Sequence, residues 1–464
     1  MKKKEYDVII VGAGPAGIFT ALELTRKNNV SVLILEKGNE IEKRECLMRS
    51  KNGGCFHCSP CAIISGWGGA GAFSDGKLNL STEIGGQLDN YINKDKVAEL
   101  IKFTDDIYLE FGADKTVYGT DEEKIDILKK EASMVKLKLI PTRIRHLGTE
   151  KCVEILKKMQ DYLRTKIDIR TGTRVKKILV NKGSAIGIET EKGETIKGKY
   201  IVVMPGRAGS EWLKEQAEAL DIKIANNPVD VGVRVEVPAV AMKRFTDAVY
   251  ESKLIYYTQM FDDRVRTFCM CPYGEVVTEF SDDITSVNGH SYQEHRTDNT
   301  NFAVLVSTNF TEPFKEPIAY GKYIAHLANI LSGGVIVQRL GDLELGRRST
   351  PDRLKHSIVI PTLKEATPGD LSFVLPYRIL SGILEMLKAM DKIAPGVYSK
   401  HTLLYGVEVK FYSSRLELSE CLETKVTNLF AAGDGAGITR GLIQASTSGI
   451  IVADAILKRM NKDK

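Results

Sequence analysis

The sequence lacks any uninterrupted apolar run of the roughly 18 residues that a membrane-spanning helix needs. Its first residues, Met1-Lys-Lys-Lys, precede an apolar stretch as in a secretion signal, but Glu5 and Asp7 interrupt that stretch. Internal repeats and low-complexity segments are also missing. We therefore expect a cytoplasmic protein without a membrane span, and the 464 residues are enough for two globular domains.

A strong charge of one sign is lacking as well, because the net charge is only +5. The charge is uneven, however, since residues 124–177 hold 16 Lys or Arg against 6 Asp or Glu. One interpretation is a solvated face on helices and strands. The other is a docking surface for an acidic electron-carrier protein or for RNA. No RNA-binding motif accompanies this segment, so nucleic acid is not the expected partner.

A glycine signature is present near the N-terminus, in Asp7-Val-Ile-Ile-Val-Gly-Ala-Gly-Pro-Ala-Gly17. An apolar strand that breaks into this pattern and continues as a helix is typical of a dinucleotide site. Gly12 makes the tight turn, Gly14 lets a pyrophosphate approach the backbone, and Gly17 lets the helix pack closely on the strand. Glu36 ends the next apolar run and is placed to accept a hydrogen bond from a ribose hydroxyl.

A second glycine turn, Gly433-Asp-Gly-Ala-Gly437, follows an apolar strand near the other end of the chain and precedes an apolar helix. Asp434 can bind a polyol hydroxyl, and Arg440 with the helix N-terminus can approach an electron-rich ring. The alternative is an ordinary strand-helix turn with Arg440 at the surface. Together the two turns resemble the two-part FAD site of flavoproteins of the glutathione-reductase and hydroxybenzoate-hydroxylase type.

This resemblance implies FAD as cofactor and contacts to it from several segments. The glycine-rich stretch from Gly66 to Lys77 suggests backbone that lies against a flat ligand. In such flavoproteins a β-meander flanks the adenosine half, and here three short strands end at 200–209. The predicted FAD contacts are Gly12, Gly14, Pro15, Ala16, Gly17, Glu36, Lys37, Arg44, Gly69, Ala70, Gly71, Asp75, Val175, Gly206, Arg207, Gly433, Asp434, Gly437 and Ile438.

The predicted fold class is α/β, with a Rossmann-like FAD-binding domain that contains a parallel sheet and a β-meander. An inserted α+β substrate domain with an antiparallel sheet is expected from Pro228, because Asp230 to Val237 alternates as a half-buried strand does. We expect residues 1–227 to form the first part of the FAD domain, with a helical insert at about 90–140. Residues 228–398 then form the substrate domain, and residues 399–464 complete the FAD domain.

Four of the eight cysteines, Cys46, Cys55, Cys58 and Cys61, lie close together in the sequence, in a chain too long for a secreted disulfide framework. Their two-residue gaps suit zinc or an iron-sulfur cluster with four thiolate ligands. The pattern departs from the bacterial ferredoxin run, because no Cys-Pro follows after three residues. A redox dithiol that exchanges electrons with the flavin, and inert reduced thiols, are the alternatives.

A second dinucleotide signature, which would mark a dedicated NAD(P)H domain, is missing from the middle of the chain. NAD(P)H is therefore expected only as a transient reductant. Arg347 and Arg348 can clamp a carboxylate or be solvated. Lys77 can contact flavin or substrate, or form a local salt bridge with Asp75. With Arg440, these three residues are the predicted catalytic residues.

Along its whole length the chain resembles a bacterial and archaeal family of FAD-dependent dehydrogenases whose substrates are unassigned. The resemblance rests on the motifs Gly12–Gly17, Cys55–Cys61 with Gly68–Lys77, Cys269–Pro272, Leu345–Ser349, Tyr405–Phe411 and Gly433–Gly437. It implies an oxidoreductase that transfers hydride between flavin N5 and a small-molecule substrate. Two other readings stay open, a tRNA-associated flavoprotein and a flavin or cluster redox sensor without steady turnover.

Overall fold

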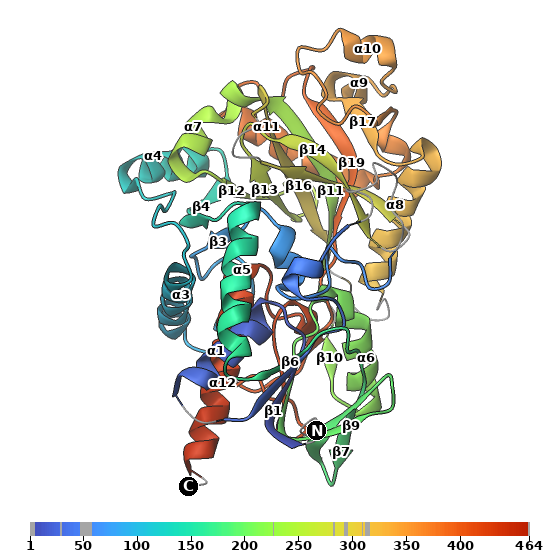
Figure 1. Cartoon of the computed structure of the whole chain (residues 1–464). Coiled ribbons are helices and arrows are strands. Elements are labelled where there is room, and N and C mark those ends of the chain that lie inside the picture. Colours follow the sequence, from blue (N-terminus) through green and yellow to red (C-terminus); the bar gives the residue numbers. More distant parts are fainter. Residues whose placement is uncertain are drawn as a thin grey trace. The chain divides into compact units, whose positions relative to one another are not determined.

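The computed structural model describes residues 5–27, 30–46, 58–225, 227–281, 284–291, 296–308, 310 and 316–462. The chain divides into two compact units, each of which contains helices and strands (Figure 1). Unit 1 contains Met1–Thr116, Arg145–Asn227 and Ser413–Lys464. Unit 2 contains Val117–Ile144 and Pro228–Tyr412.

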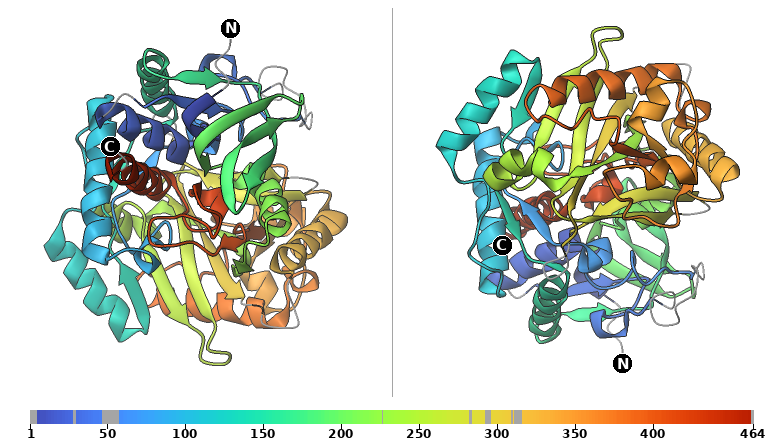
Figure 2. Two further views of the ribbon diagram at one scale, coloured as in Figure 1. Left: turned by 90° about the horizontal axis from the view of Figure 1, so that it is seen from below. Right: turned by 90° about the horizontal axis from the view of Figure 1, so that it is seen from above.

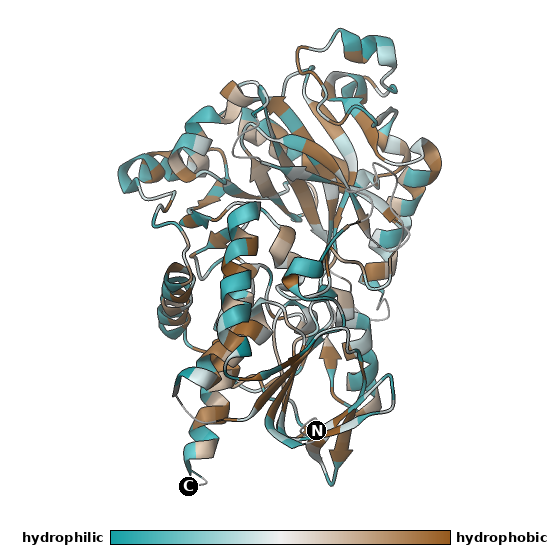
Figure 3. Cartoon of the chain, viewed as in Figure 1, coloured by the Kyte–Doolittle hydropathy of each residue, from teal (hydrophilic) through white to brown (hydrophobic). Residues whose placement is uncertain are grey.

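Unit 1 is built on a seven-stranded sheet with a parallel part and an antiparallel meander. The parallel strands, in spatial order, are β6 (Asp168–Arg170), β2 (Val32–Leu35), β1 (Glu5–Val11), β9 (Thr195–Val203) and β21 (Leu429–Ala431). The meander consists of β7 (Val175–Asn181), β8 (Ser184–Thr190) and the first part of β9. β2 is completely buried and β1 nearly so, as expected of strands that are covered on both faces. The sheet of unit 1 around β1 is largely hydrophobic (Figure 3).

The helices of unit 1 bring the two ends of the chain together. They are α1 (Pro15–Lys27), α3 (Lys94–Glu110), α5 (Thr149–Arg164), α6 (Ser210–Ala219) and α12 (Leu442–Lys462). α12 packs against α1 so closely that a Cβ at Gly449 would lie 2.2 Å from the carbonyl oxygen of Ala16 (Figure 2). The hydroxyl of Thr20 donates to the Gly449 carbonyl at 3.0 Å. The first and last elements of the chain therefore belong to one unit.

Unit 2 is built on an eight-stranded sheet in which every neighbouring pair except β17 and β18 is antiparallel. In spatial order the strands are β18 (Thr367–Pro368), β17 (Ile336–Arg339), β19 (Leu403–Lys410), β11 (Val229–Pro238), β16 (Asn299–Thr308), β13 (Arg264–Cys271), β12 (Lys253–Tyr257) and β4 (Leu137–Ile140). A separate hairpin is formed by β14 (Glu275–Ser281) and β15 (Ile284–His290). The helices are α4 (Glu122–Met134), α7 (Ala239–Val249), α8 (Pro317–Ser332), α9 (Leu340–Glu344), α10 (Pro351–Lys355) and α11 (Tyr377–Asp391).

The central strand of unit 2, β11, has one apolar and one polar face. Its valines, from Val229 to Val237, belong to the main hydrophobic core of the unit. The alternating positions Asp230, Arg234 and Glu236 are buried too, and each forms hydrogen bonds with other polar side chains. The alternation seen in the sequence is therefore real, but its polar positions are not exposed to solvent.

The observed unit boundaries differ from the expected ones at two places. The helical insert expected at about 90–140 is divided, because α3 belongs to unit 1 whereas α4 and β4 belong to unit 2. β4 pairs with β12, which places it in the sheet of unit 2. Unit 2 also continues to Tyr412, beyond residue 398, because β19 pairs with β11 and β17.

The predicted fold class is confirmed, since the chain is an α/β protein with a parallel-rich sheet and several antiparallel sheets. Among the described residues, no helix is both long and apolar enough to cross a membrane.

Candidate functional site

The first glycine turn lies at the end of β1 and close to β9. Gly12 has a φ of +108°, and a Cβ there would lie 2.1 Å from the carbonyl oxygen of Met204. A Cβ at Gly17 would lie 2.0 Å from the carbonyl oxygen of Gly12. At Gly14, in contrast, a Cβ would meet no atom of the described residues within 4 Å. Packing therefore requires Gly12 and Gly17, whereas Gly14 faces open space.

Three neighbouring parallel strands of unit 1 end at the same edge of the sheet. Val11 of β1 pairs with Val203 of β9, and Val203 pairs with Ala431 of β21. Ligands of open α/β sheets bind beyond the carboxyl ends of the strands. The turn after β9 contains Gly206, with a φ of +64°, where a Cβ would also meet none of the described atoms within 4 Å. This edge offers accessible glycine backbone, which fits a dinucleotide such as FAD.

The helix that follows the first turn starts with Pro15 and Ala16, two of the predicted contacts. A proline at the first position of a helix leaves no backbone donor unsatisfied there. The free N–H groups of the first helical turn, with the helix dipole, suit a pyrophosphate. The structure therefore places Gly14, Pro15 and Ala16 together at the edge where β1 ends.

Glu36, directly after β2, is 6 % exposed, and its carboxylate holds the surrounding loops. Its Oε2 accepts a hydrogen bond from the backbone N–H of Ala13 at 2.9 Å. Its Oε1 accepts from the N–H groups of Gly38 and Gly66 at 2.8 and 2.9 Å. A carboxylate has roughly four acceptor positions, so one remains for a ribose hydroxyl. Glu36 thus connects three loops at the edge of the sheet.

Arg44 is also buried, and the structure gives it a different role from the predicted contact with FAD. Its Nη1 donates to the carbonyls of Trp67 at 2.6 Å and Gly69 at 2.8 Å. Its Nε and Nη2 donate to the carbonyls of Ala62 and Ile63 at 2.9 and 2.7 Å. Burial lowers the pKa of Arg44 to about 10. These four hydrogen bonds use most of the N–H donors of Arg44. The side chain therefore fixes the backbone of the glycine-rich loop and does not bind a phosphate directly.

The glycine-rich loop lies against the first glycine turn. The N–H of Gly68 donates to the Ala13 carbonyl at 2.7 Å, and a Cβ at Gly69 would lie 3.2 Å from the Cα of Gly14. Gly69, Ala70 and Gly71 form the first part of a 3-10 helix, η2 (Gly69–Phe73). The Cys152 thiol of α5 donates to the Gly71 carbonyl at 3.3 Å. The predicted contacts from residues 69–71 therefore lie beside those of the N-terminal signature.

Asp75 and Lys77, directly after η2, form the local ion pair that the sequence left open, with Oδ2 and Nζ 2.9 Å apart. His146 belongs to the same group, because Leu147 and Gly148 donate backbone hydrogen bonds to the carbonyls of Gly76 and Asp75. Burial lowers the pKa of His146, whereas the charge of Asp75 raises it. Sequence reasoning missed His146, since it is about seventy residues from Asp75 and no local motif marks it.

The C-terminal turn places Asp434 at the end of β21. Its Oδ1 accepts a hydrogen bond from the Thr439 hydroxyl at 2.8 Å, and its Oδ2 accepts one from the Gly441 N–H at 3.5 Å. Burial raises the pKa of Asp434, and the charges of Arg207 and Arg440 lower it. The charges of two predicted site residues therefore act on Asp434: Arg207 from the turn after β9, and Arg440 from the turn of Asp434 itself.

Close backbone packing fixes the rest of this turn. Gly433 and Gly437 have φ values of +75° and +73°. A Cβ at Gly435 would lie 2.6 Å from the Gly206 carbonyl oxygen. The buried Ile438 accepts a backbone hydrogen bond from Gln87 at 2.9 Å. The turns after β9 and β21 are therefore in contact.

Lys37 and Val175 lie in the same unit but make structural contacts. The ammonium group of Lys37 donates to the Ala208 carbonyl at 2.9 Å, and burial lowers its pKa. Val175 is buried at the start of β7 and pairs with Thr190. The backbone N–H of Thr173 donates to the Glu36 carbonyl at 2.8 Å, which ties the meander to β2.

The structure places Arg347 and Arg348 in unit 2, just after α9. Nε of Arg347 donates to Oδ1 of Asp342 at 2.9 Å. Arg348 is exposed, and its backbone carbonyl accepts a hydrogen bond from Arg353 at 2.7 Å. The two adjacent arginines therefore do not form one clamp, because Arg347 binds a carboxylate of the chain itself.

The cysteine cluster can be followed only in part, because Cys55 lies outside the described residues. Cys58 is exposed, and Cys46 and Cys61 are half-buried. Within the described part of the chain, no group of three or more His, Cys, Asp or Glu side chains has the arrangement of a metal site.

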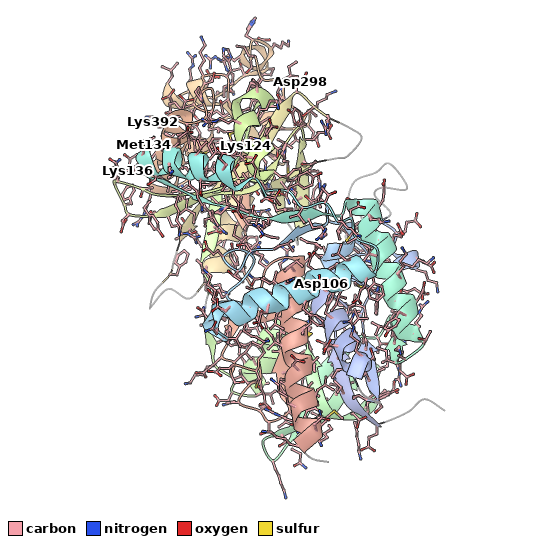
Figure 4. All side chains as sticks on the ribbon, turned by 90° about the vertical axis from the view of Figure 1, so that its left-hand side faces the viewer. Asp106, Lys124, Met134, Lys136, Asp298 and Lys392 are labelled. Carbon is pink, nitrogen blue, oxygen red and sulfur yellow. The ribbon has the colours of Figure 1, made fainter. Side chains whose placement is uncertain are left out.

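The basic segment 124–177 is largely neutralised by ion pairs with acidic residues. Some partners lie outside the segment, such as Glu42 for Lys157 and Glu194 for Arg170. Figure 4 labels Lys124, Met134 and Lys136 along α4 and the turn after it, where Lys124 pairs with Asp121. The local excess of positive charge in the sequence therefore overstates the charge of the surface.

Comparison with known proteins gives two family matches. Residues 228–411 match the model described as "FAD-dependent protein, C-terminal domain-like", and residues 10–41 match "NAD(P)-binding Rossmann-like domain". Residues 228–411 are thus similar to FAD-dependent proteins. The first match supports the predicted cofactor FAD, and the second supports the predicted Rossmann-like fold.

Two relatives align with nearly the whole chain. A protein of Clostridium beijerinckii is 29 % identical, and the alignment covers 98 % of this chain and 81 % of that one. The tRNA uridine 5-carboxymethylaminomethyl modification enzyme of Fusobacterium nucleatum is 22 % identical, with 99 % of this chain but only 64 % of that enzyme covered.

Solved structures also align over almost the full chain. A variant of Aspergillus oryzae formate oxidase has a TM-score of 0.47 and 11 % identity, with both chains fully covered. The 3-ketosteroid dehydrogenase of Rhodococcus jostii has a TM-score of 0.45 and 13 % identity, with 98 % and 97 % covered. At these values the similarity says nothing about the substrate.

Proposed function

We propose that this flavoprotein is a dehydrogenase or reductase that exchanges hydride with an unidentified small molecule. The observation that carries this proposal is the edge of the unit 1 sheet, where Gly14, Glu36 and Asp434 arrive from turns after three different strands. Bound FAD would supply the chemistry by accepting or donating hydride at N5. The chain's own residues hold and orient the cofactor.

The proposed roles follow from the contacts of each side chain. The N-terminus of α1, with Gly14 open beside it, binds the pyrophosphate. The remaining acceptor position of Glu36 binds a ribose hydroxyl, and Asp434 binds the ribityl chain. Arg440, in the turn before α12, provides positive charge for the reduced ring. The ion pair of Lys77 with Asp75 lies directly after η2 and can hold a proton close to the ring.

The first test is to purify the full chain without oxygen and to measure its absorption spectrum, its FAD content, and its iron, zinc and sulfide. We expect one FAD per chain and bleaching of the flavin bands by a reductant. NADH and NADPH are the first reductants to try, since a transient pyridine nucleotide fits a chain with one dinucleotide signature. Protein that neither contains nor binds FAD would refute the proposal.

The metal analysis also addresses the cysteines. An auxiliary zinc or iron-sulfur centre requires a fixed amount of metal per chain, which Cys58→Ser would abolish. Flavin without metal leaves the redox dithiol and the inert thiols, which thiol titration before and after flavin reduction distinguishes. Steady turnover with a reductant and an acceptor would exclude a sensor that only changes state.

A second candidate function is that of a tRNA-associated flavoprotein. The similarity to the Fusobacterium nucleatum tRNA-modification enzyme, which spans 99 % of this chain, favours it. The ion pairs that basic residues of segment 124–177 form with acidic residues outside it argue against a broad basic surface. Binding of tRNA by the FAD-loaded protein, measured from 50 to about 200 mM salt, decides the question, because phosphate contacts make the affinity fall steeply with salt. No binding at the lowest salt would exclude this function.

A further inference from the structure

Three arginines of unit 2 converge on one buried carboxylate. Asp342 of α9 is fully buried and accepts hydrogen bonds from Arg347 Nε at 2.9 Å and from the Ser349 hydroxyl at 2.8 Å. Nε of Arg339 lies 4.0 Å from Oδ2 of Asp342, and Nε of Arg353 lies 4.0 Å from Oδ1. These residues come from the end of β17, the loop after α9, and α10, which follow one another in the chain (Figure 1).

The charges of this cluster do not balance. One carboxylate faces three guanidinium groups, so an excess of two positive charges remains. The other acidic side chains of the segment have different partners, since Glu344 accepts from the Tyr398 hydroxyl and Asp352 pairs with Lys355. Among the described residues, no further carboxylate pairs with the three arginines.

Hydrogen-bond donors are left over as well. Arg339 is only 12 % exposed, and its buried Nε has no hydrogen-bond partner among the described residues. Its Nη1 donates to the Arg353 carbonyl, and Nη1 of Arg353 donates to the Arg348 carbonyl. These bonds hold the two side chains in place, while Nε of Arg339 stays without a hydrogen bond among the described residues. A buried donor without a partner is costly, so a ligand that satisfies it is expected.

The surroundings are also positive. His401 lies close enough that the charges of Arg339 and Lys400 both lower its pKa, in addition to burial. Arg347 and Arg353 are 47 % and 37 % exposed, so a solute can reach the cluster from outside.

We propose that Arg339, Arg347 and Arg353 form a binding site for a phosphate group, as inorganic phosphate or as a phosphate monoester. Such a group carries a charge of about −1.5 to −2 at pH 7, which matches the excess of two. The planar guanidinium also fits phosphate oxygens with two parallel hydrogen bonds. A single carboxylate would leave half of the excess charge uncompensated. The site does not depend on the proposed hydride transfer.

The test is isothermal titration calorimetry of the FAD-loaded full chain at pH 8 and constant ionic strength. The probes are inorganic phosphate, glycerol 3-phosphate and acetate. We expect saturable binding of the first two and none of acetate. Tighter binding of the ester indicates an organic phosphate as the natural ligand, whereas equal binding indicates that the phosphate group alone is recognised. Acetate that binds as well as phosphate, or a lack of phosphate binding, would overturn the proposal.

Two variants separate a specific site from general attraction by charge. Arg353→Gln removes a converging guanidinium that is exposed enough for the fold to tolerate its loss, and it should weaken phosphate binding by about tenfold or more. Lys355→Gln removes one positive charge from the same helix, but Lys355 pairs with Asp352 and does not face Asp342. It should change the affinity less than about twofold. Equal effects of the two variants would contradict a built site.

Discussion

Each unit of the chain contains a deeply buried arginine, and the two arginines have different binding partners. Arg44 of unit 1 donates to four backbone carbonyls, and burial lowers its pKa to about 10. Arg234 of unit 2, with no exposed surface, forms two 2.8 Å hydrogen bonds with the equally buried Glu408, and this carboxylate raises its pKa. Arg44 fixes the backbone of loops, whereas Arg234 connects strands β11 and β19.

The removal of each arginine leaves different groups without a hydrogen-bond partner. When Arg44 is lost, the carbonyls that it leaves are uncharged, and those of the half-buried Ala62, Ile63 and Gly69 can turn toward water or toward other donors. Glu408 cannot do so, because it lies inside the sheet, where an unpaired charge is expensive. We therefore expect Arg44 to matter for the cofactor site and Arg234 for folding.

The largest effect is expected for Arg234→Met, which leaves Glu408 buried with Lys410 as its remaining ion-pair partner at 3.2 Å. The loss of stability should be about 3–5 kcal/mol. Urea unfolding of unit 2, followed by circular dichroism, measures it. Arg378→Met, which breaks the exposed pair with Asp263, is the control and should cost at most about 1 kcal/mol. Equal losses would mean that burial does not distinguish the two ion pairs.

Gly14→Val tests the proposed cofactor site of unit 1. The added side chain enters open space, so the stability of the protein without FAD should stay nearly the same. It also occupies the place where the pyrophosphate must approach the backbone, so the affinity for FAD should fall by about a hundredfold. Titration of FAD-free protein, followed by flavin fluorescence, gives this affinity. Unchanged FAD binding would refute the placement of the cofactor at Gly14.

Arg44→Lys should have a smaller effect on the same measurement. An ammonium keeps the charge but cannot reach four carbonyls in different directions, so the loop near Gly69 loosens. We expect FAD affinity to fall by about tenfold and the unfolding of unit 2 to stay unchanged. Arg26→Lys is the matched control, because Arg26 on α1 pairs with Glu110 at the surface. If Arg44→Lys lost as much global stability as Arg234→Met, Arg44 would matter for folding as much as Arg234 does, contrary to our expectation.

The smallest effect concerns Glu236, a buried carboxyl of β11 for which the described part of the chain provides no ion pair. Burial raises its pKa, although Thr362 and Tyr405 donate to it, each at 2.6 Å. A carboxyl with a raised pKa in the folded state stabilises the fold fully below its unfolded pKa and loses this contribution as the pH rises through the folded value. Glu236→Gln should remove the decline in stability above about pH 4.3. Urea midpoints across pH 4 to about 8 measure it, and parallel curves for the two proteins would contradict the expected linkage.

The sequence predicted unit 1 far better than unit 2. The patterns around Gly12 and Gly433 are local, because a strand, a turn and the next helix follow one another within a few residues. The division of the chain at Pro228 was visible for the same reason, as a change of periodicity. β4 could not be assigned to unit 2 from the sequence, because its partner β12 is more than a hundred residues away.

Individual side chains were harder to predict than elements. Glu36 was expected at the site because motif spacing marks it, but its three backbone amide partners come from separate loops. Arg44 was expected to contact FAD, and its actual partners lie up to 25 residues further along the chain. The group of Asp75, Lys77 and His146 likewise forms only when distant segments meet.

The dinucleotide site could be predicted from local sequence, since its two glycine turns require backbone conformations that neighbouring residues encode. The alternation of apolar and polar residues in β11 could be predicted in the same way. Which charges are buried, and which groups they bind, could not be predicted, because burial and hydrogen bonding depend on neighbours from other strands and loops. Arg44 therefore binds loop carbonyls, Arg234 forms a buried ion pair with Glu408, and Arg347 belongs to a cluster of three arginines around Asp342.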